Sequence, residues 1–200
     1  MTKKATKKSY VVFNGKKPGI YDTWAECQEQ TKGVKGAKFK SYEDHAEAIR
    51  EFEAHQNHSD IPQEEIDYSI NVDASTLGNP GIMEYRCTYT KNKEIIFESK
   101  KYEIGTNNIG EFLALVDAMK YLKEKNELNR IIFTDSVTAM SWVKNKAIKT
   151  SLEKNSKTEE LYKKLDESVA WLKSEDTKCY SLKKWDTFLM GQVPSDYDRK

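Results

Sequence analysis

Residues 66–81, IDYSINVDASTLGNPG, decide the fold, because they predict a strand that delivers a carboxylate to a turn of small residues. Apolar residues alternate with polar ones from Ile66 to Val72, which is the period of a strand with one buried face. After Asp73 the pattern breaks into Ala, Ser, Thr, Gly, Asn and Pro, and such residues let another backbone approach closely. A plain hairpin with an acid at its strand end would show the same pattern, so the role of Asp73 depends on whether further acids lie near it.

A second acid stands near the beginning of a predicted helix. Residues 82–90 and 94–104 alternate in character and, together with 66–74, predict a three-stranded antiparallel meander. The apolar residues at 112, 115, 119 and 122 then have helical spacing and predict a helix to about residue 125. Glu111 is expected in the first turn of that helix, where the helix dipole also favours a carboxylate. Helix capping and a functional role are therefore both open for Glu111.

A third acid follows a predicted buried strand. The run RIIFTD at residues 130–135 is a short apolar segment that ends in Asp135, and a helix is predicted over 136–146. A strand–helix–parallel strand crossover would bring Asp135 to the same edge of the sheet as Asp73. Three converging carboxylates suit two Mg²⁺ ions about 4 Å apart, one activating a water and one stabilising the leaving oxygen of a phosphodiester. Residues 59–200 contain no histidine, which excludes Ser-His-Asp catalysis from that part of the chain.

Composition places the chain among soluble, reduced proteins of one ordinary domain plus a small one. It has 200 residues, 38% hydrophobic content and a mean hydropathy of −0.81. The formal net charge is only +1, but residues 1–57 carry a net +3 and the remainder a net −2, which fits a nucleic-acid-binding module beside a metal-dependent enzyme. Three cysteines without a CxxC pair indicate free thiols. We expect a cytoplasmic protein with no membrane segment, acting as a monomer without an obligate protein partner.

The N-terminal part predicts a small module with aromatic residues among lysines. Residues 1–9 are basic and polar and are expected to be disordered. Between residues 10 and 53 the pattern predicts about three strands and two helices, the first helix opening with a capping box at Thr23–Glu26. Aromatic rings can stack on bases or sugars while lysines meet phosphates, although the same rings could fill the small core. The residues singled out are Tyr10, Trp24, Lys38, Phe39 and Lys40.

This N-terminal run, YVVFNGKKPGIYDTWAECQEQTKGVKGAKFKSYEDHAEA, resembles the hybrid-binding domain found in many ribonucleases H and in caulimovirus viroplasmin proteins. The resemblance implies that Trp24 and Phe39 form an aromatic cradle for a DNA strand, with Tyr10 alongside. It also implies that neighbouring lysines and backbone amides meet RNA 2′-hydroxyls and phosphates. Residues 54–65, which are rich in His, Gln and acids and contain Pro62, are interpreted as a linker.

The remainder resembles the ribonuclease H catalytic domain through three motifs in order: Asp73-x-Ser-x-x-Gly-Asn-Pro-Gly, Thr-Asn-Asn-x-x-Glu111 and Thr-Asp135-Ser. The resemblance implies that these three acids, with a final Asp near the C-terminus, hold two Mg²⁺ ions, with Mn²⁺ able to substitute. We assign the final Asp to Asp196, because in the shorter bacterial forms this acid precedes a Tyr a few residues from the end. Asp186 and Asp198 remain alternatives.

The resemblance also implies how an RNA–DNA hybrid is selected. Gly78, Asn79, Asn107 and Asn108 match positions that contact RNA 2′-hydroxyls. Thr106, Asn108 and Thr150 match a pocket that grips a DNA phosphate. The predicted activity is therefore endonucleolytic hydrolysis of the RNA strand of a hybrid, leaving 5′-phosphate and 3′-hydroxyl ends. The alternative is a hybrid-binding protein of viroplasmin type with weak or no catalysis.

Two positions depart from the family pattern. Ala74 stands where many relatives have Gly after the first Asp, and Gln192 stands where relatives carry a His or Glu thought to help the product leave. The predicted fold is α/β, a ribonuclease H-like five-stranded mixed sheet flanked by helices over residues 66–200. The three-stranded, two-helix module of residues 10–53 precedes it.

Overall fold

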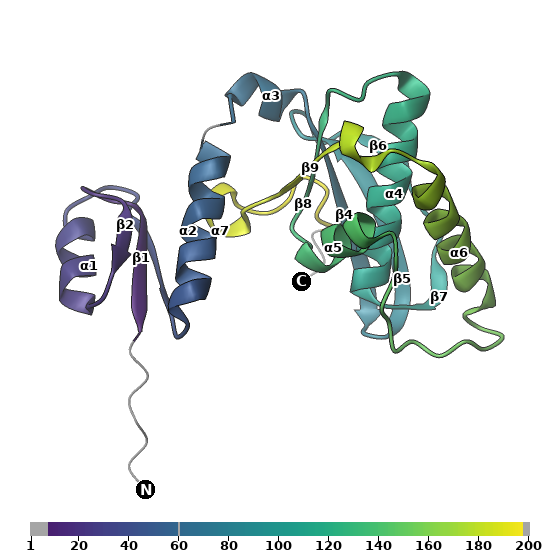
Figure 1. The fold of residues 1–200 in the computed structure, drawn as a ribbon, viewed down its shortest axis with the longest axis horizontal. Coiled ribbons are helices and arrows are strands. Elements are labelled where there is room, and N and C mark those ends of the chain that lie inside the picture. Colours follow the sequence, from purple (N-terminus) through teal and green to yellow (C-terminus); the bar gives the residue numbers. More distant parts are fainter. Residues whose placement is uncertain (1–7, 60, 198–200) are drawn as a thin grey trace, which may run out of the picture. The chain divides into compact units, whose positions relative to one another are not determined.

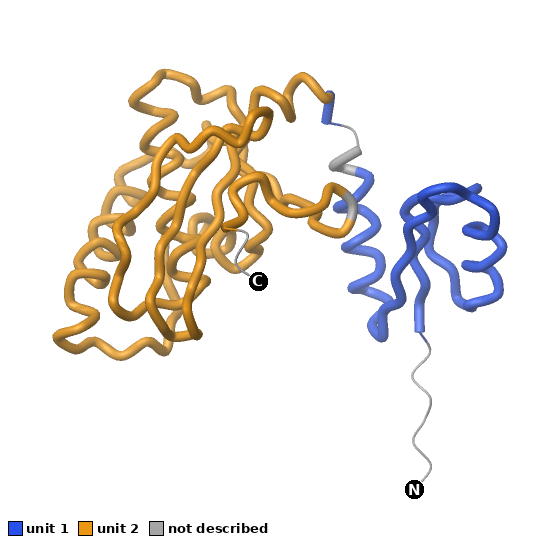
Figure 2. Tube along the Cα trace, turned by 180° about the vertical axis from the view of Figure 1, so that it is seen from behind, with its two compact units in different colours: residues 1–62 blue, residues 63–200 orange. Residues whose placement is uncertain are grey.

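The computed structural model describes residues 8–59 and 61–197 and divides the chain into two compact units, residues 1–62 and 63–200 (Figure 2). We call them the smaller and the larger unit and describe each by itself. Most of the tail predicted over residues 1–9 lies outside the described residues. Ser9, however, is a buried residue of the first strand, so the prediction of disorder is wrong for this residue.

The smaller unit is a three-stranded antiparallel sheet with two helices. Its strands are β1 (Ser9–Asn14), β2 (Gly19–Tyr21) and β3 (Lys38–Tyr42), in the order β2-β1-β3. Its helices are α1 (Trp24–Thr31) and α2 (His45–Ser59). The predicted capping box is confirmed, since the Thr23 side chain accepts from the Glu26 backbone amide and the Glu26 carboxylate accepts from the Thr23 amide.

Most of the residues interpreted as a linker are helical. Helix α2 continues through Ser59, and a short helix α3 (Gln63–Asp67) follows Pro62. One reason is that His55 meets the ring of Phe13 edge-on, with centroids 5.3 Å apart, so α2 gains packing where its sequence lacks an apolar period. Because α3 occupies residues 63–67, the strand predicted from Ile66 begins at Ile70 instead.

The larger unit contains a mixed sheet of six strands. Its order is β6-β5-β4-β8-β9, with β7 also paired to β5. The pairs of β5 with β4, β6 and β7 are antiparallel, whereas β4–β8 and β8–β9 are parallel. The strands are β4 (Ile70–Gly78), β5 (Gly81–Tyr89), β6 (Ile95–Glu98), β7 (Tyr102–Gly105), β8 (Ile131–Thr134) and β9 (Ser181–Lys184).

The sixth strand arises where the sequence predicted one strand over 94–104. Residues 99–101 interrupt it, and the two halves, β6 and β7, pair with different parts of β5. The Ser99 hydroxyl accepts from the Tyr85 amide at 2.9 Å and donates to the Lys100 carbonyl. A side chain thus takes the place of a ladder hydrogen bond at the break.

Helix α4 is the centre of the core of the larger unit (Figure 1). It packs against β4 and β5 and against α5 and α6, and most of its residues from Ile109 to Leu122 are buried. A helix that is apolar on nearly all sides is expected at such a position. The helices are α4 (Asn107–Lys125), α5 (Val137–Asn145), α6 (Glu159–Ser174), a 3₁₀ turn (Thr177–Cys179) and α7 (Thr187–Met190). Among the described helices, none combines the length and the apolar character that crossing a membrane requires.

Candidate functional site

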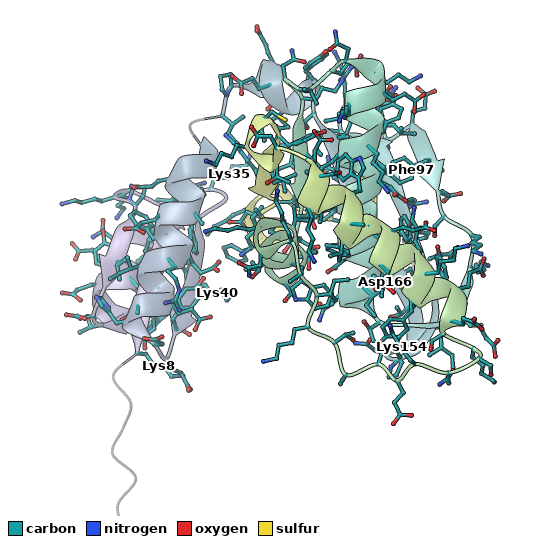
Figure 3. All side chains as sticks on the ribbon, turned by 45° about the vertical axis from the view of Figure 1, so that its right-hand side comes forward. Lys8, Lys35, Lys40, Phe97, Lys154 and Asp166 are labelled. Carbon is teal, nitrogen blue, oxygen red and sulfur yellow. The ribbon has the colours of Figure 1, made fainter. Side chains whose placement is uncertain are left out.

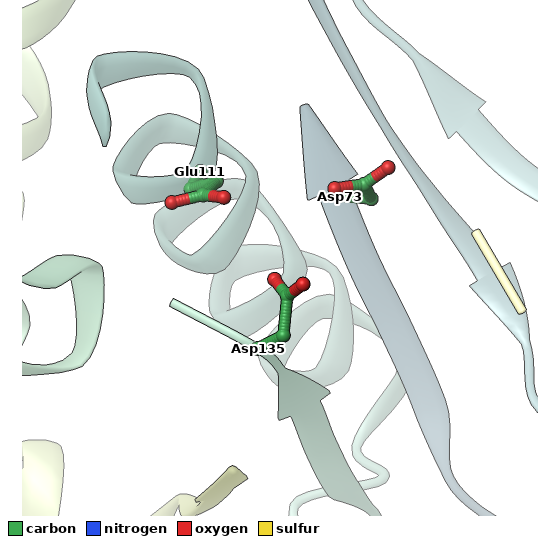
Figure 4. Close-up of side chains that lie close together, drawn as sticks. All are labelled: Asp73, Glu111 and Asp135. Atoms are coloured by element: carbon green, nitrogen blue, oxygen red, sulfur yellow. The ribbon is translucent and has the colours of Figure 1, made fainter. Parts of the chain in front are cut away.

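Three acids from separate elements meet at one edge of the large sheet (Figure 4). Asp73 belongs to β4, Glu111 belongs to α4, and Asp135 directly follows β8. One carboxylate oxygen from each lies within 4.8 Å of the other two. The convergence expected from the sequence is therefore present.

The parallel register of β4 and β8 explains why Asp73 and Asp135 are neighbours. Ile70 pairs with Ile132 and Asn71 with Phe133, so extending the same register by two residues places Asp73 beside Asp135. Immediately after Asp135 the chain turns into α5. Ser136 caps that helix by accepting from the Ala139 amide at 3.2 Å, and this turn leaves Asp135 at the end of the sheet.

A close contact between α4 and β4 brings Glu111 to the same place. A Cβ added at Gly110 would lie 2.6 Å from the Cβ of Ala74 and 3.1 Å from the sulfur of Met83. Only glycine fits there, so the helix approaches the strand closely enough for the next residue, Glu111, to reach Asp73. The same contact shows how the chain accommodates Ala74, because the missing side chain at Gly110 leaves room for its methyl group.

Glu111 lies one turn further into its helix than predicted. Helix α4 begins at Asn107, and its cap is Thr106, whose hydroxyl accepts from the Ile109 amide at 3.4 Å. The capping interpretation of Glu111 is therefore wrong. Its carboxylate instead accepts a 2.7 Å hydrogen bond from the side chain of Asn107, whose backbone amide donates to the Asn79 side chain at 3.3 Å.

Burial and the charges of neighbouring acids raise the pKa values of these acids. Burial, followed by the charge of Asp135, raises the pKa of Asp73 to about 8. Burial raises the pKa of Glu111 to about 7, although hydrogen bonds from Ser136 and Asn107 oppose the rise. The pKa of Asp135 is raised as well, first by burial and then by Asp196. A cluster in which carboxylates resist ionisation is one that a divalent cation would neutralise, and carboxylate oxygens are the donors that Mg²⁺ prefers.

The three candidates for the final acid differ in their surroundings. The charge of Asp196 contributes to the raised pKa of both Asp73 and Asp135, so it acts on two members of the cluster. Asp186 lies at the start of α7, where its side chain accepts from the Phe188 amide at 3.0 Å. Asp198 lies outside the described residues. These surroundings favour Asp196 over Asp186.

Next to the acids, a polar cavity of about 290 Å³ collects several of the predicted substrate-binding residues. Thr106, Asn108, Thr150 and Asn79 line it, whereas Gly78 and Asn107 do not. The sequence pattern did not single out its other lining residues, which are Pro80, Trp142, Lys149, Ser151 and Leu152. Lys149 and Ser151 flank the predicted Thr150 in the sequence, and this could have marked them as candidates, because cationic and hydroxyl side chains together suit an anion.

A larger cavity of about 870 Å³ lies elsewhere in the larger unit, along α6 and the loop before it. Lys154 and Asp166, both labelled in Figure 3, are among its lining residues and form an ion pair of 3.8 Å. Its lining includes none of the predicted site residues. We therefore place the functional site at the acids and the smaller cavity, despite the difference in volume.

The aromatic residues of the smaller unit form an exposed cluster. The ring centroids of Tyr10 and Trp24 are 5.8 Å apart, and those of Trp24 and Phe39 are 5.3 Å apart. Trp24 is 45% exposed and Phe39 is 40% exposed. The interpretation that these two rings fill the core is therefore wrong. In a unit with so little apolar material, exposed rings in contact with one another indicate a binding surface.

The structure separates two of the predicted lysines from that cluster. Lys38 and Lys40 alternate with Phe39 along β3, so they project from the opposite face of the strand. The amino group of Lys40, labelled in Figure 3, lies 4.9 Å from the ring centroid of Tyr42. These lysines therefore do not share the side of β3 from which Phe39 projects.

Comparison with known proteins agrees with this division of the chain. A family model described as the ribonuclease H1 N-terminal domain matches residues 8–50, and a model described as RNase H matches residues 65–179. A curated ribonuclease H of Crithidia fasciculata is 44% identical over 52 residues, which are 26% of this chain and 10% of that protein. The matched segment thus spans about a tenth of that relative.

Several solved structures are also similar. LC11-RNase H1, isolated from compost, is 22% identical with a TM-score of 0.39, over 58% of this chain and 81% of its own. The same protein solved in complex with RNA/DNA hybrid is 20% identical with a TM-score of 0.38, over 58% and 83%. RNase H1 of the halophilic archaeon Halobacterium salinarum is 18% identical with a TM-score of 0.36, over 58% and 83%. Because the RNase H model covers more than half of the 200 residues and includes Asp73, Glu111 and Asp135, the chain belongs to the ribonuclease H family.

Proposed function

We propose that this protein is an endonuclease that hydrolyses the RNA strand of RNA–DNA hybrids with the help of divalent metal ions. The observation that carries the proposal is the meeting of Asp73, Glu111 and Asp135 within 4.8 Å at the sheet edge. Family membership gives the cluster its expected chemistry, since it lies within the matched range. The products would carry 5′-phosphate and 3′-hydroxyl ends.

The cluster suits two Mg²⁺ ions, for which Mn²⁺ would substitute. Its donors are hard carboxylate oxygens, and the pKa values of Asp73 and Glu111 are raised first by burial and then by the charge of neighbouring acids, which a bound cation would offset. We expect these two acids and Asp135 to hold the ions, with Asp196 completing the set. Bound there, the ions would activate a water and stabilise the leaving oxygen of the cleaved phosphodiester.

The protein's own residues would fix the geometry of the reaction. Asn107 holds one oxygen of Glu111 through its 2.7 Å hydrogen bond, so the carboxylate keeps one orientation. The short side chains around Asp73, together with the partly buried setting of the acids, would admit a phosphate backbone while limiting water. Asn79, whose side chain already accepts from the Asn107 amide, would stand beside the scissile strand.

Selection of a hybrid would come from the loops on either side of the acids. Gly78, Asn79, Asn107 and Asn108 would contact 2′-hydroxyls, which only an RNA strand presents. The 290 Å³ cavity would take a phosphate of the DNA strand through Thr106, Thr150 and Asn108. Lys149 in the lining would add the positive charge that a phosphate requires.

The smaller unit would bind the hybrid without preference for its base sequence. Trp24 and Phe39 offer exposed faces on which bases or sugars can stack. This exposed cluster also supports the second candidate function, a hybrid-binding protein with weak or no catalysis. In that case the acids of the larger unit would be present but unable to support turnover.

The deciding experiment uses a strand-labelled RNA–DNA hybrid in Mg²⁺, with duplex RNA, duplex DNA and an Asp73→Asn variant as controls. We expect cleavage of only the RNA strand of the hybrid, and loss of cleavage in the variant. Tight hybrid binding without cleavage in either Mg²⁺ or Mn²⁺ would overturn the enzymatic proposal and leave the binding function.

A further inference from the structure

Arg86 of β5 makes three contacts with the C-terminal segment, which we define as residues 195–197. Its Nε donates to the Ser195 carbonyl at 2.8 Å, and its Nη2 donates to the Asp196 carbonyl. Its guanidinium carbon lies 4.2 Å from the ring centroid of Tyr197. One side chain of the sheet therefore contacts each of the three consecutive residues, with Asp196 in the middle.

The position of Arg86 in the sheet links this contact to the acids. Asp73 of β4 pairs with Arg86, and Arg86 pairs with Glu98 of β6. Paired residues of adjacent strands project from the same face of a sheet. The guanidinium also forms an ion pair of 3.5 Å with Glu98, and the Arg86 side chain is only 17% exposed. Glu98 of the edge strand β6 thus fixes the Arg86 side chain, and Arg86 in turn holds the C-terminal segment near Asp73.

The C-terminal segment has little regular structure of its own. It lies beyond α7, in neither a helix nor a strand, and the Asp196 amide donates to the Val193 carbonyl at 2.9 Å. The contacts from Arg86 use two main-chain oxygens and the Tyr197 ring. They therefore fix the backbone at Asp196 by means that do not involve its carboxylate.

We propose that Arg86 is a positioning residue that holds residues 195–197 against β5 so that the carboxylate of Asp196 completes the acid cluster. The inference rests on the proposed function and deepens it by naming what positions the fourth acid. The planar guanidinium can donate to two carbonyls and stack on a ring at the same time, and a lysine ammonium cannot reproduce that geometry.

The chain offers a closely matched control in Arg130. Its guanidinium carbon lies 3.7 Å from the ring centroid of Tyr68, it donates to the Tyr68 carbonyl, and it pairs with Glu127 at 2.6 Å. Arg130 has the same kinds of contact as Arg86, but it precedes β8, whereas Asp135 follows that strand. Arg130→Ala therefore removes an equivalent structural contact at the opposite end of β8 from the acids.

The first test compares the kinetics of the two alanine variants on a labelled RNA–DNA hybrid. Loss of a residue that positions a metal ligand typically lowers activity about 10- to 100-fold, so we expect Arg86→Ala to lower kcat by this factor with KM little changed. Arg86→Lys should give an intermediate kcat. Arg130→Ala should lower Tm to a similar extent and leave kcat unchanged. Equal kcat values for the two alanine variants would overturn the proposal.

A double-mutant cycle tests whether Arg86 acts through Asp196. In an Asp196→Asn background the further change Arg86→Ala should have little effect on kcat, because the group that it positions is already lost. Full additivity of the two losses would show that Arg86 acts in some other way and would overturn the inference.

Hydrogen exchange gives a readout that is independent of activity. In metal-free protein, Arg86→Ala should speed exchange of the amides in residues 192–197, whereas Arg130→Ala should not. Unchanged exchange in Arg86→Ala would mean that other contacts hold the segment and would overturn the inference. If the wild-type protein fails to cleave hybrids, the proposed function fails, but this measurement still decides whether Arg86 holds the segment.

Discussion

The acid cluster of the larger unit and the aromatic cluster of the smaller unit are unusual in opposite ways, since one buries charged side chains and the other exposes apolar rings. Glu111 is only 6% exposed and has two acids beside it, whereas Trp24 is 45% exposed although its ring is largely apolar. Charged side chains are usually exposed and large rings usually covered. Under the proposed function, a cation would offset the charge of the acids and a base or sugar would stack on the rings.

The two clusters also differ in how the chain builds them. Asp73 lies within β4, Asp135 directly follows β8 and Glu111 belongs to α4, and a contact as close as Gly110 against Ala74 sets their spacing. The rings come from one small module and have no charge to balance. We therefore expect the acids to control the rate of reaction and the rings to control affinity, and the two should be separable by mutation.

The largest effect should follow the loss of one charge from the acid cluster. Asp135→Asn preserves size but removes a ligand, and we expect kcat to fall on the order of 1,000-fold, equivalent to about 4 kcal/mol of transition-state stabilisation. Hybrid affinity should stay near that of the wild-type protein, because the aromatic cluster is untouched. Single-turnover rates and binding titrations would check both. If Asp135→Asn retained a tenth of the wild-type rate, the proposal that the acid cluster controls the rate of reaction would be wrong.

The reciprocal change at the aromatic cluster should alter affinity alone. Stacking of a base on an aromatic side chain contributes about 1–3 kcal/mol, so Trp24→Ala should raise KM for the hybrid by about 10- to 100-fold, with kcat at saturation unchanged. As a control, Ile49→Ala removes another exposed apolar side chain of the same unit, and it should change neither KM nor kcat. If Trp24→Ala lowered kcat instead, the proposed division of labour would be wrong.

The acids were predictable because their positions follow from chain topology. Alternation located the strand carrying Asp73, an apolar run located the strand before Asp135, and the crossover rule brought them to one edge. Glu111 was placed one turn too early, because the apolar spacing that marked its helix begins at Phe112, whereas Thr106 and Asn107 begin the helix. The exposure of Trp24 and Phe39 could not be decided from composition, since a small core can absorb such rings.

Other features were out of reach because they depend on contacts between distant residues. Nothing in residues 94–104 reveals that Ser99 would break the predicted strand by bonding to Tyr85. The extension of α2 past the apolar period depends on Phe13, far earlier in the chain. The contacts of Arg86 with residues 195–197 span more than 100 positions. Periodicity carries no information about such pairs.

Ionisation of the buried acids should lower the free energy of unfolding of the metal-free protein as the pH rises. The pKa of Asp73 is raised from 3.8 to about 8 in the folded protein, so between these values the folded state holds a proton that the unfolded state has lost. Stability of the metal-free protein should therefore fall as pH rises from about 4 to 8.

Asp73→Asn removes that titration. Its gain in unfolding free energy over the wild-type protein should be small near pH 4 and should grow by about 1.4 kcal/mol per pH unit as the pH rises toward 8. Denaturant unfolding at several pH values in chelator, then in Mg²⁺, would measure it. A gain independent of pH would contradict the assignment of this cost to the Asp73 charge.

The smallest effect concerns Gln192, an exposed residue four positions before Asp196. If a titratable group there helps the product to leave, Gln192→Glu should raise multiple-turnover kcat about 2- to 10-fold, equivalent to ~0.4–1.4 kcal/mol. The rate of single-turnover cleavage should not change, because we expect the chemical step to depend on the acid cluster and substrate affinity to depend on the aromatic cluster. A faster single turnover would instead mean that position 192 acts on the chemical step, and the acid cluster would then have to be redrawn to include it.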